Sequence, residues 1–368
     1  MTTRSGVALD AAVRVERPGG FVLDMAITAD PGEIVAVLGP SGAGKSTLLG
    51  ALAGLDRLDA GHVRVGDRTV SSRERHVPPA HRGVALLGQD SLLFPHLTAR
   101  ENVAFPMRAA GVPRAIARDR ADDWLDRLGL AGLGPRRPDE LSGGQQQRAA
   151  LARALAAEPH VVLLDEPLTG LDVETASEIR EVLRRQVRAA EVTTVLVTHS
   201  AVDAAALADR IFVVEAGIVT QRGPVAEVLR SPRTRFAAAV AGVNRIEGAV
   251  RAGQWADAAG AGIRIPAPGT ADGRAHAVFA PRAMRSARTP GGPAAAGDVV
   301  AWTARVRRIE PVPFGARVHT TSPDTAIEVT ADALADGSWE VGCEVWLSVD
   351  LAAVRVVPAG AAPGSRSP

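Results

Sequence analysis

The residues best suited to chemistry form a glycine-rich string around Lys45, the only lysine in the chain. Glycines at this spacing let backbone N–H groups turn inward around phosphate oxygens, and an ammonium group reaches terminal phosphates as a compact point charge. We therefore predict a phosphate-binding loop in which Lys45 contacts the terminal phosphates and the Ser46 hydroxyl ligates Mg²⁺. The loop and the start of its helix comprise Gly39, Pro40, Ser41, Gly42, Ala43, Gly44, Lys45, Ser46 and Thr47.

The rarity of lysine sharpens this prediction. Apart from Lys45, all of the 42 Lys plus Arg residues are arginine, an excess that a GC-rich genome explains. Codon bias does not explain why the one remaining lysine falls within the loop. Because a guanidinium is a wide planar fork, it cannot take the place of an ammonium group between two phosphates, so we expect the lysine to be required.

Two acidic residues after an apolar run form the second candidate site. Val161–Leu164 is predicted to be a buried strand, and Asp165 and Glu166 follow it directly. Taken alone, such a pattern is usually a strand that enters a turn. With a phosphate loop upstream, we expect Asp165 to hold the Mg²⁺ shell and Glu166 to polarise an attacking water.

Alternating strands and helices must position these groups. Ile34–Leu38 is a continuous apolar run that ends at Gly39, so we predict a strand buried on both faces, followed by a helix at residues 46–55. The alternation along the chain predicts a doubly wound parallel α/β sheet, into which a mostly helical subdomain at residues 113–157 is inserted. Further buried strands are expected at residues 161–164, 194–197 and 211–214, with a helix at residues 202–208.

A third motif stands at the start of a predicted helix, Gln145–Ala157. A serine and two glycines precede this helix, which creates either a second anion-binding helix start or an ordinary helix cap. The motif comprises Leu141, Ser142, Gly143, Gly144, Gln145, Gln146, Gln147 and Arg148.

Together the three motifs resemble the ATP-binding subunits of ABC transporters, in which Leu-Ser-Gly-Gly-Gln is the signature. The resemblance implies a P-loop NTPase fold over residues 1–235, with the helical subdomain at about residues 90–158, and ATP and Mg²⁺ as cofactors. Gln89 matches the glutamine loop that senses Mg²⁺ and relays to the membrane subunit. Thr169 to Asp172 matches the loop that crosses the dimer interface, and His199 matches the switch histidine. A lone histidine at a strand end is otherwise a hydrogen-bonded structural residue.

In that family two copies meet head to tail, so that each nucleotide lies between the phosphate loop of one copy and the signature of the other. Two anion-binding helix starts in one chain fit such a shared site. Because the chain has no tyrosine, the group that stacks on adenine stays open, with Arg17 and Phe21 as candidates. The resemblance assigns catalysis to Lys45, Gln89, Glu166 and His199, Mg²⁺ binding to Ser46, Gln89 and Asp165, and further nucleotide contacts to Ser142, Gly143, Gly144, Gln145 and Asp172.

The composition limits the class of protein. A length of 368 residues predicts about two domains, and a formal charge of +1 gives no basic excess of the kind that would indicate nucleic acid. The single cysteine, Cys343, excludes an internal disulfide and is expected to be a small core residue in a reducing compartment. We expect neither a secretory signal nor a membrane span, so another chain would supply any span.

After about residue 235 the pattern changes to short alternating runs around an Ala/Gly/Pro-rich stretch, residues 266–297. These runs predict a small β barrel or sandwich at residues 236–368. The stretches Trp302 to Glu310 and Gly342 to Val349 are similar to the oligonucleotide-fold barrel at the C-terminus of importer ATPases, although a generic β domain is the alternative. Phe94 to Thr98 and Glu101 to Val103 look most like molybdate importers.

The resemblance thus implies an importer ATPase that forms a homodimer at the cytoplasmic face of the membrane, binds permease subunits and serves a solute-binding protein indirectly. Molybdate or a related oxyanion is the expected solute, and iron, polyamine or sulfate are the alternatives. A soluble ABC-type ATPase of DNA repair or translation would be expected to carry two cassettes or a strong basic surface. A regulatory module with a vestigial ATPase conflicts with the intact Lys45, Glu166 and His199.

Overall fold

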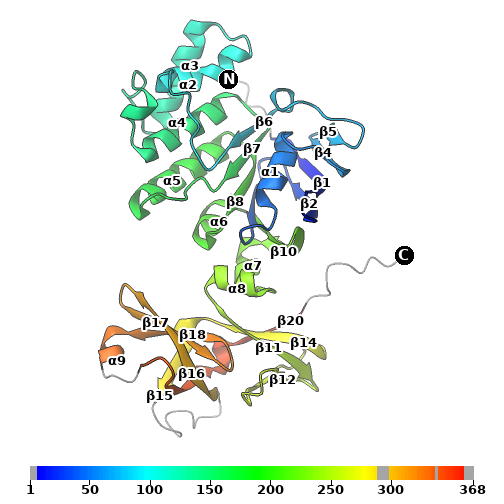
Figure 1. Ribbon diagram of the computed structural model, residues 1–368, viewed down its shortest axis with the longest axis vertical. Coiled ribbons are helices and arrows are strands. Elements are labelled where there is room, and N and C mark those ends of the chain that lie inside the picture. Colours follow the sequence, from blue (N-terminus) through cyan, green and yellow to red (C-terminus); the bar gives the residue numbers. More distant parts are fainter. Residues whose placement is uncertain (1–5, 288–297, 336–338, 360–368) are drawn as a thin grey trace. The chain divides into compact units, whose positions relative to one another are not determined.

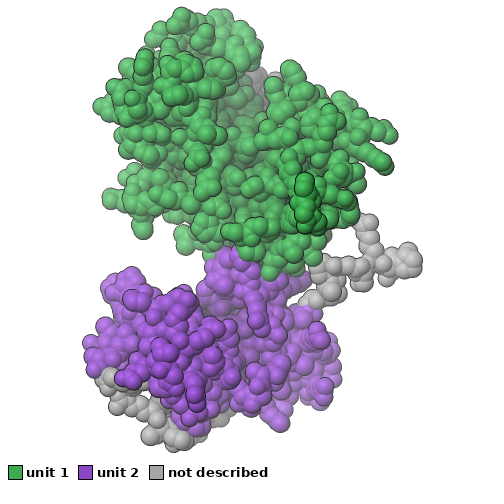
Figure 2. Space-filling model, viewed as in Figure 1, with its two compact units in different colours: residues 1–226 green, residues 227–368 purple. Residues whose placement is uncertain are grey.

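A six-stranded sheet organises the first of two units, residues 1–226, in the computed structural model, which describes residues 6–287, 298–335 and 339–359 (Figures 1 and 2). Five of its strands run parallel, and β10 pairs antiparallel with β9 at one edge. In sheet order the strands are β10 (Ile218–Pro224), β9 (Arg210–Glu215), β3 (Ile34–Leu38), β8 (Thr193–Thr198), β7 (Val161–Asp165) and β6 (Val84–Leu87). The predicted parallel sheet is confirmed.

Each face of this sheet has its own hydrophobic core. Successive side chains of a strand point to opposite faces, so Val35 and Val37 of β3 belong to one core and Ile34 to the other. On the first face lies α1 (Lys45–Ala53), together with a second, antiparallel sheet. That sheet has the order β2 (Val22–Ala29), β1 (Leu9–Glu16), β4 (Ala60–Val65) and β5 (Arg68–Ser72).

Helices cover the second face. Helices α2 to α4 lie within residues 90–158, the range that the resemblance implies for the helical subdomain, although α2 precedes residue 113, where the residue pattern alone places its start. Thr98 and Glu101 form a reciprocal capping box at the start of α2, and Pro106 inside the helix obscures its pattern in the sequence. The helices are α2 (Ala99–Ala109), α3 (Arg114–Arg127), α4 (Gly143–Ala156), α5 (Val173–Ala189) and α6 (Ala201–Leu207).

The second unit, residues 227–368, is the predicted all-β domain and consists of two five-stranded antiparallel sheets around one core. Cys343 is half-buried and packs against this core. The first sheet has the order β13 (Arg264–Pro266), β12 (Gln254–Asp257), β11 (Asn244–Arg251), β14 (Gly273–Phe279) and β20 (Arg355–Pro358). The second has the order β15 (Met284–Ala287), β19 (Glu344–Asp350), β16 (Val299–Val312), β17 (Gly315–Thr321) and β18 (Thr325–Thr330).

Short helices join and accompany the sheets. The two compact units divide between residues 226 and 227, whereas the sequence placed the domain boundary near residue 235. Residues 288–297 of the Ala/Gly/Pro-rich stretch lie outside the described residues. Within the described part of the chain, no helix is both long and apolar enough to span a membrane. The short helices are α7 (Val225–Arg230), α8 (Arg235–Ala241) and α9 (Ala331–Ala335).

Candidate functional site

The phosphate loop joins β3 to α1, as the sequence predicted. Gly44 has a φ of 100° and immediately precedes α1. A Cβ on this residue would lie 2.7 Å from Leu23 Cδ1 and 2.8 Å from Phe21 Cζ, so only glycine fits. A Cβ on Gly39 would collide with the backbone carbonyl of Val214. The loop is therefore held in place by direct backbone contact with its surroundings.

Lys45 lies at the first position of α1, and its ammonium group bends back over the loop. Nζ donates to the carbonyl oxygens of Gly39 at 2.7 Å and Pro40 at 3.0 Å. Burial lowers the pKa of Lys45, whereas the charges of Glu166 and Asp165 act to raise it. The Lys45 ammonium group therefore lies close enough to both carboxylates to be stabilised by their negative charge.

Four parallel strands end at the same edge of the sheet and bring the predicted catalytic groups together. Leu38 at the end of β3 pairs with Thr198 at the end of β8, and Asp165 at the end of β7 pairs with Val197. His199 follows β8 directly, and Gln89 comes two residues after β6, where it is exposed. This edge is where an open α/β sheet binds ligands.

Glu166 is held in an unusual backbone conformation beside His199. Its φ is 47°, in the left-handed region that non-glycine residues rarely adopt, and its N–H donates to the carbonyl of Val197 at 2.9 Å. Oε2 lies 3.2 Å from Nδ1 of His199 and accepts a 3.1 Å hydrogen bond from the Thr169 hydroxyl. The sequence did not predict the contact with Thr169, which fixes the carboxylate from a second direction.

The donor set at this edge fits Mg²⁺. Burial, and then the charge of Glu166, raise the pKa of Asp165, so a cation beside the pair would relieve an unfavourable concentration of negative charge. A hydroxyl, a carboxylate and an amide from Ser46, Asp165 and Gln89 are hard oxygen ligands. In the described residues no three His, Cys, Asp or Glu side chains form a metal cluster. Mg²⁺ needs only one or two carboxylates when phosphates supply other ligands.

The signature motif caps α4 on the other face of the sheet. The Ser142 hydroxyl accepts from the Gln145 N–H at 3.3 Å, and the Gln145 side chain accepts from the Ser142 N–H at 3.0 Å. Ser142 and Gly143 are exposed. Because α1 and α4 pack in different cores, the structure does not bring this motif to the Lys45 group within one chain.

Asp172 acts as the cap of α5 and is linked to the signature through Thr175. Its carboxylate accepts from the Thr175 N–H at 2.9 Å and the Thr175 hydroxyl at 2.7 Å, and the backbone bond from Thr175 is the main cause of its lowered pKa. A Cβ on Gly144 would lie 2.6 Å from Cγ2 of the same threonine. The interface-loop aspartate and the signature glycine are therefore adjacent parts of one packed corner.

Arg153 of α4 holds the segment after Gln89, a contact that the sequence did not predict. Its guanidinium donates to the carbonyls of Ser91 at 3.0 Å and Leu92 at 2.9 Å and lies 5.3 Å from the centre of the Phe94 ring. The Ser91 hydroxyl also donates to Gln146 at 3.4 Å. No local motif marks Arg153, because its partners lie about sixty residues earlier in the chain.

The two candidates for adenine stacking occupy different positions. The Phe21 ring packs against the position of Gly44 and the first core. The Arg17 guanidinium donates to Asp56 at 2.6 Å, and 39% of its side chain is exposed. Arg17 therefore remains the better placed of the two to offer a planar face to a base.

The chain is similar to ATP-binding proteins of known import systems. The family model described as ABC transporter matches residues 22–169. The molybdenum import ATP-binding protein ModC of Mycobacterium tuberculosis is 43% identical over 349 residues, which cover 92% of this chain and 94% of that protein. The Fe(3+) ions import ATP-binding protein FbpC of Agrobacterium fabrum is 42% identical over 215 residues, which cover 58% of this chain and 60% of that protein.

A putative 2-aminoethylphosphonate import ATP-binding protein, PhnT of Salmonella typhimurium, is 40% identical over 251 residues, covering 68% of this chain and 67% of that protein. Among solved structures, the dimeric post-hydrolysis state of the ATP-binding cassette MJ0796 bound to ADP and Pi matches with a TM-score of 0.53 and 29% identity. That match covers 60% of this chain and 99% of the cassette chain.

Proposed function

Because the chain belongs to the ABC transporter family, we propose that it is the ATP-hydrolysing subunit of an importer and drives uptake of molybdate or a related oxyanion through a separate permease. The observation that carries the ATPase proposal is the meeting of Lys45, Asp165, Glu166 and His199 at one sheet edge. The similarity to the molybdenum import protein supports the solute, because it spans 92% of the chain and so extends through the second unit. The matches to the Fe(3+) and phosphonate import proteins cover 58% and 68%.

The residues at the edge have separate roles in hydrolysis. The loop N–H groups and Lys45 bind the phosphates. Glu166 orients a water and accepts its proton as the water attacks the terminal phosphorus, the bond from that phosphorus to the bridging oxygen breaks, and ADP leaves. His199 and Thr169 keep the Glu166 carboxylate in place. Ser46, Asp165 and Gln89 would hold Mg²⁺, which neutralises developing charge on the phosphates when bound. Positioning and charge stabilisation supply the rate enhancement.

A second copy of the chain would complete the nucleotide site. The signature residues Ser142 and Gly143 are exposed at a helix start that packs on the face opposite α1. An exposed helix start binds phosphate through its free N–H groups, so the signature of one copy suits the nucleotide held by the other. Gln145 would hold Ser142 in its capping geometry, and Asp172 would support the neighbouring interface loop.

A permease is the proposed partner for the exposed apolar side chains near the glutamine loop. Leu92 is 71% exposed and Phe105 is 45% exposed, and the Phe105 ring lies 4.7 Å from that of Phe94 between centres. Apolar side chains that gather beside a catalytic loop suit contact with another protein. The chain would thus act at the cytoplasmic face of the membrane, with a solute-binding protein delivering solute to the permease.

Glu166→Gln tests the shared ATP site. The amide keeps the size of the carboxylate but cannot accept the proton of the water, so MgATP should remain bound and hold two copies together. Size-exclusion chromatography with ATP and Mg²⁺ should give a dimer, and Lys45→Ala should stay monomeric as the matched control. A Glu166→Gln protein that stays monomeric at saturating ATP contradicts the shared site.

The solute needs a separate measurement. The chain is purified with its permease and binding protein, and ATP hydrolysis is measured with molybdate, tungstate, sulfate, Fe(3+) or a polyamine. Molybdate and tungstate should stimulate hydrolysis. If only Fe(3+) or a polyamine stimulates hydrolysis, the proposed solute is wrong but the chain is still an importer ATPase. Hydrolysis that does not change when the permease is present favours a soluble ABC-type ATPase.

A further inference from the structure

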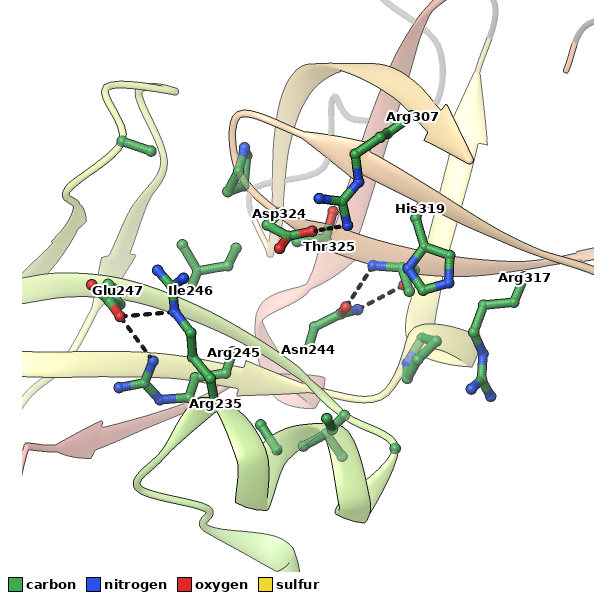
Figure 3. Close-up of a pocket in the computed structure, with 18 of the residues that line it drawn as sticks. Arg235, Asn244, Arg245, Ile246, Glu247, Arg307, Arg317, His319, Asp324 and Thr325 are labelled. Atoms are coloured by element: carbon green, nitrogen blue, oxygen red, sulfur yellow. Dashed lines mark hydrogen bonds and ion pairs between the residues drawn. The ribbon is translucent and has the colours of Figure 1, made fainter. Parts of the chain in front are cut away.

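A cavity of about 610 Å³ lies within the second unit, far in sequence from every residue of the ATP site. Figure 3 shows its labelled residues in two groups. Arg307, Arg317 and His319 come from β16 and β17, and Arg235, Arg245 and Glu247 come from α8 and β11. Asn244 lies between the groups.

A β-bulge places two consecutive arginines on the same face of β16. The pairing with β17 shifts register between Val306 and Arg308, so Arg307 is the extra residue. Before the bulge the even-numbered side chain Val306 is buried, whereas after it the odd-numbered Ile309 packs against the core. Arg307 and Arg308 are therefore both exposed on the face that looks away from the core. Bulges often re-aim side chains in this way at functional sites.

The floor of the cavity is fixed by a buried asparagine. Asn244 is 5% exposed, and its side chain bridges β11 to β18, donating to the Ala326 carbonyl at 2.8 Å and accepting from the Ala326 N–H at 2.7 Å. His319 pairs across the ladder with Ala326 on one side and with Arg308 on the other. Asn244 thus links β11 to the ladder that carries the arginines of β16 and β17.

The lining carries more positive than negative groups. It holds the five arginines Arg235, Arg245, Arg307, Arg308 and Arg317, against the carboxylates of Glu247 and Asp324. Arg307 meets Asp324 at 3.2 Å, while Arg308 and Arg317 meet Glu310 at 2.6 Å and Glu328 at 2.8 Å, each through one guanidinium nitrogen. Because a guanidinium has five N–H donors, these pairs use a small part of the donor capacity.

Two of these arginines have a buried donor without a partner. Within the described residues, the Nε atoms of Arg245 and Arg317 are buried and make no hydrogen bond. Only 8% of the Arg245 side chain is exposed, so solvent access is small. A buried N–H donor is unfavourable until an acceptor reaches it, and phosphate oxygens are strong acceptors for arginine.

The side of the cavity formed by α8 and β11 carries apolar side chains beside Arg235, Arg245 and Glu247. Ala238 and Ala239 of α8, together with Val243, Ile246 and Pro281, contribute to the lining. A volume of about 610 Å³ falls within the range of about 300–1,000 Å³ that is typical for organic ligands, and it is far larger than a four-oxygen anion requires.

We propose that this cavity binds a phosphorylated organic molecule, with its phosphate on Arg307, Arg308 and Arg317 and its apolar body against Ala238 and Ala239. A phosphate offers more acceptor oxygens than a carboxylate does to the guanidinium N–H donors that these ion pairs leave unused. The inference is independent of which solute is imported, because it rests on the second unit alone.

The test uses the full chain carrying Lys45→Ala, so that phosphate binding at the ATP site does not contribute. Isothermal titration calorimetry measures phenyl phosphate, with phenol, inorganic phosphate and molybdate as comparison probes. Phenyl phosphate should bind at least tenfold more tightly than each of the other three. Equal binding by inorganic phosphate or molybdate overturns the organic ligand in favour of a simple oxyanion site.

Variants locate the binding. Adding Arg307→Gln and Arg317→Gln should weaken phenyl phosphate at least tenfold, while adding Arg264→Gln, an exposed arginine of β13 outside the lining, should leave it unchanged. Ala239→Phe should also abolish binding, because the ring fills the apolar side while all the arginines remain. Circular dichroism verifies that each variant is folded. If the Arg307→Gln/Arg317→Gln protein and the Ala239→Phe protein are both folded and bind phenyl phosphate as tightly as the parent, the cavity is not the binding site.

Discussion

The ATP edge of the first unit and the arginine cavity of the second unit concentrate positive charge by opposite means. The first combines a single ammonium group, Lys45, with backbone N–H groups of a loop that Gly39 and Gly44 let pack against its neighbours. The second relies on guanidinium groups from four elements and on the register shift at Arg307. Backbone donors are set by a short local motif, whereas side-chain donors are assembled from residues far apart in sequence.

This difference predicts unequal sensitivity to substitution. A loop whose geometry depends on backbone contacts and one compact cation should tolerate almost no change. A cavity in which several arginines share the work should lose affinity gradually and leave ATP hydrolysis alone.

Lys45→Arg should have the largest effect. The charge stays, but the guanidinium cannot occupy the space above the Gly39 and Pro40 carbonyls that the ammonium now fills. We expect ATP turnover to fall by roughly 10²- to 10³-fold, the usual cost of losing one preorganised charge contact at a reacting phosphate. Steady-state phosphate release measures it, and Arg264→Gln should retain wild-type turnover. A Lys45→Arg enzyme with near-normal turnover would show that the backbone N–H groups of the loop are sufficient to bind the phosphates for hydrolysis.

Gly144→Ala and Gly143→Ala separate packing from ligand contact at the signature. The new Cβ at residue 144 would lie 2.6 Å from Cγ2 of Thr175, so α4 and α5 must shift, and we expect a loss of about 1–3 kcal/mol in unfolding free energy. A Cβ at residue 143 meets no atom within 4 Å. Gly143→Ala should therefore keep wild-type stability in urea. It should still lose ATPase activity if the nucleotide bound to a second copy contacts Gly143. Full activity in the stable variant argues against the composite site.

How far the sequence predicted the fold depended on burial. Strands buried on both faces, such as Ile34–Leu38 and Val161–Leu164, are continuous apolar runs and were placed within a residue of their observed ends. The half-buried strands of the antiparallel sheet in the first unit were missed, although the alternating runs of the second unit were predicted as strands. Leu9, Ala11, Val13 and Val15 alternate with more polar residues along β1, so a period-two signal was present but our prediction did not include it.

For the site, the motifs placed the groups but not the contacts between them. Lys45, Asp165, Glu166 and His199 meet because parallel strands end at one edge, which alternating strands and helices already imply. The contact of Arg153 with Ser91 could not be predicted, because no local pattern specifies which distant side chain completes a hydrogen bond. The sequence also contained no sign of the cavity lined by arginines in the second unit, since the register shift between β16 and β17 is seen only when the two strands are paired.

Arg153→Gln should have an intermediate effect. It removes two hydrogen bonds to the Ser91 and Leu92 carbonyls and the contact with the Phe94 ring, with an expected loss of about 1–2 kcal/mol in local stability. Amide hydrogen exchange should rise at residues 89–94 and stay unchanged in β16 and β17. If Arg153 links the glutamine loop to the signature helix, permease-stimulated hydrolysis should fall more than basal hydrolysis. Equal losses would make its role purely structural.

Asp165→Asn should have the smallest effect on folding, and its sign is opposite to that of the other substitutions. Burial and Glu166 raise the pKa of Asp165, so the native state holds this proton more tightly than the unfolded chain, whose carboxyl titrates near 3.8. The resulting stability is present below that pH and is lost as the pH rises through the raised pKa. At pH 7 the ionised carboxylate is therefore a net cost, and its removal should raise Tm by about 1–2 °C without nucleotide, a small gain because the site is partly solvated. With ATP and Mg²⁺ the order should reverse, since the wild-type carboxylate then has a cation to bind. A variant that is less stable than the wild type at pH 7 in the absence of nucleotide would mean that the nearby Lys45 ammonium already compensates the two carboxylates.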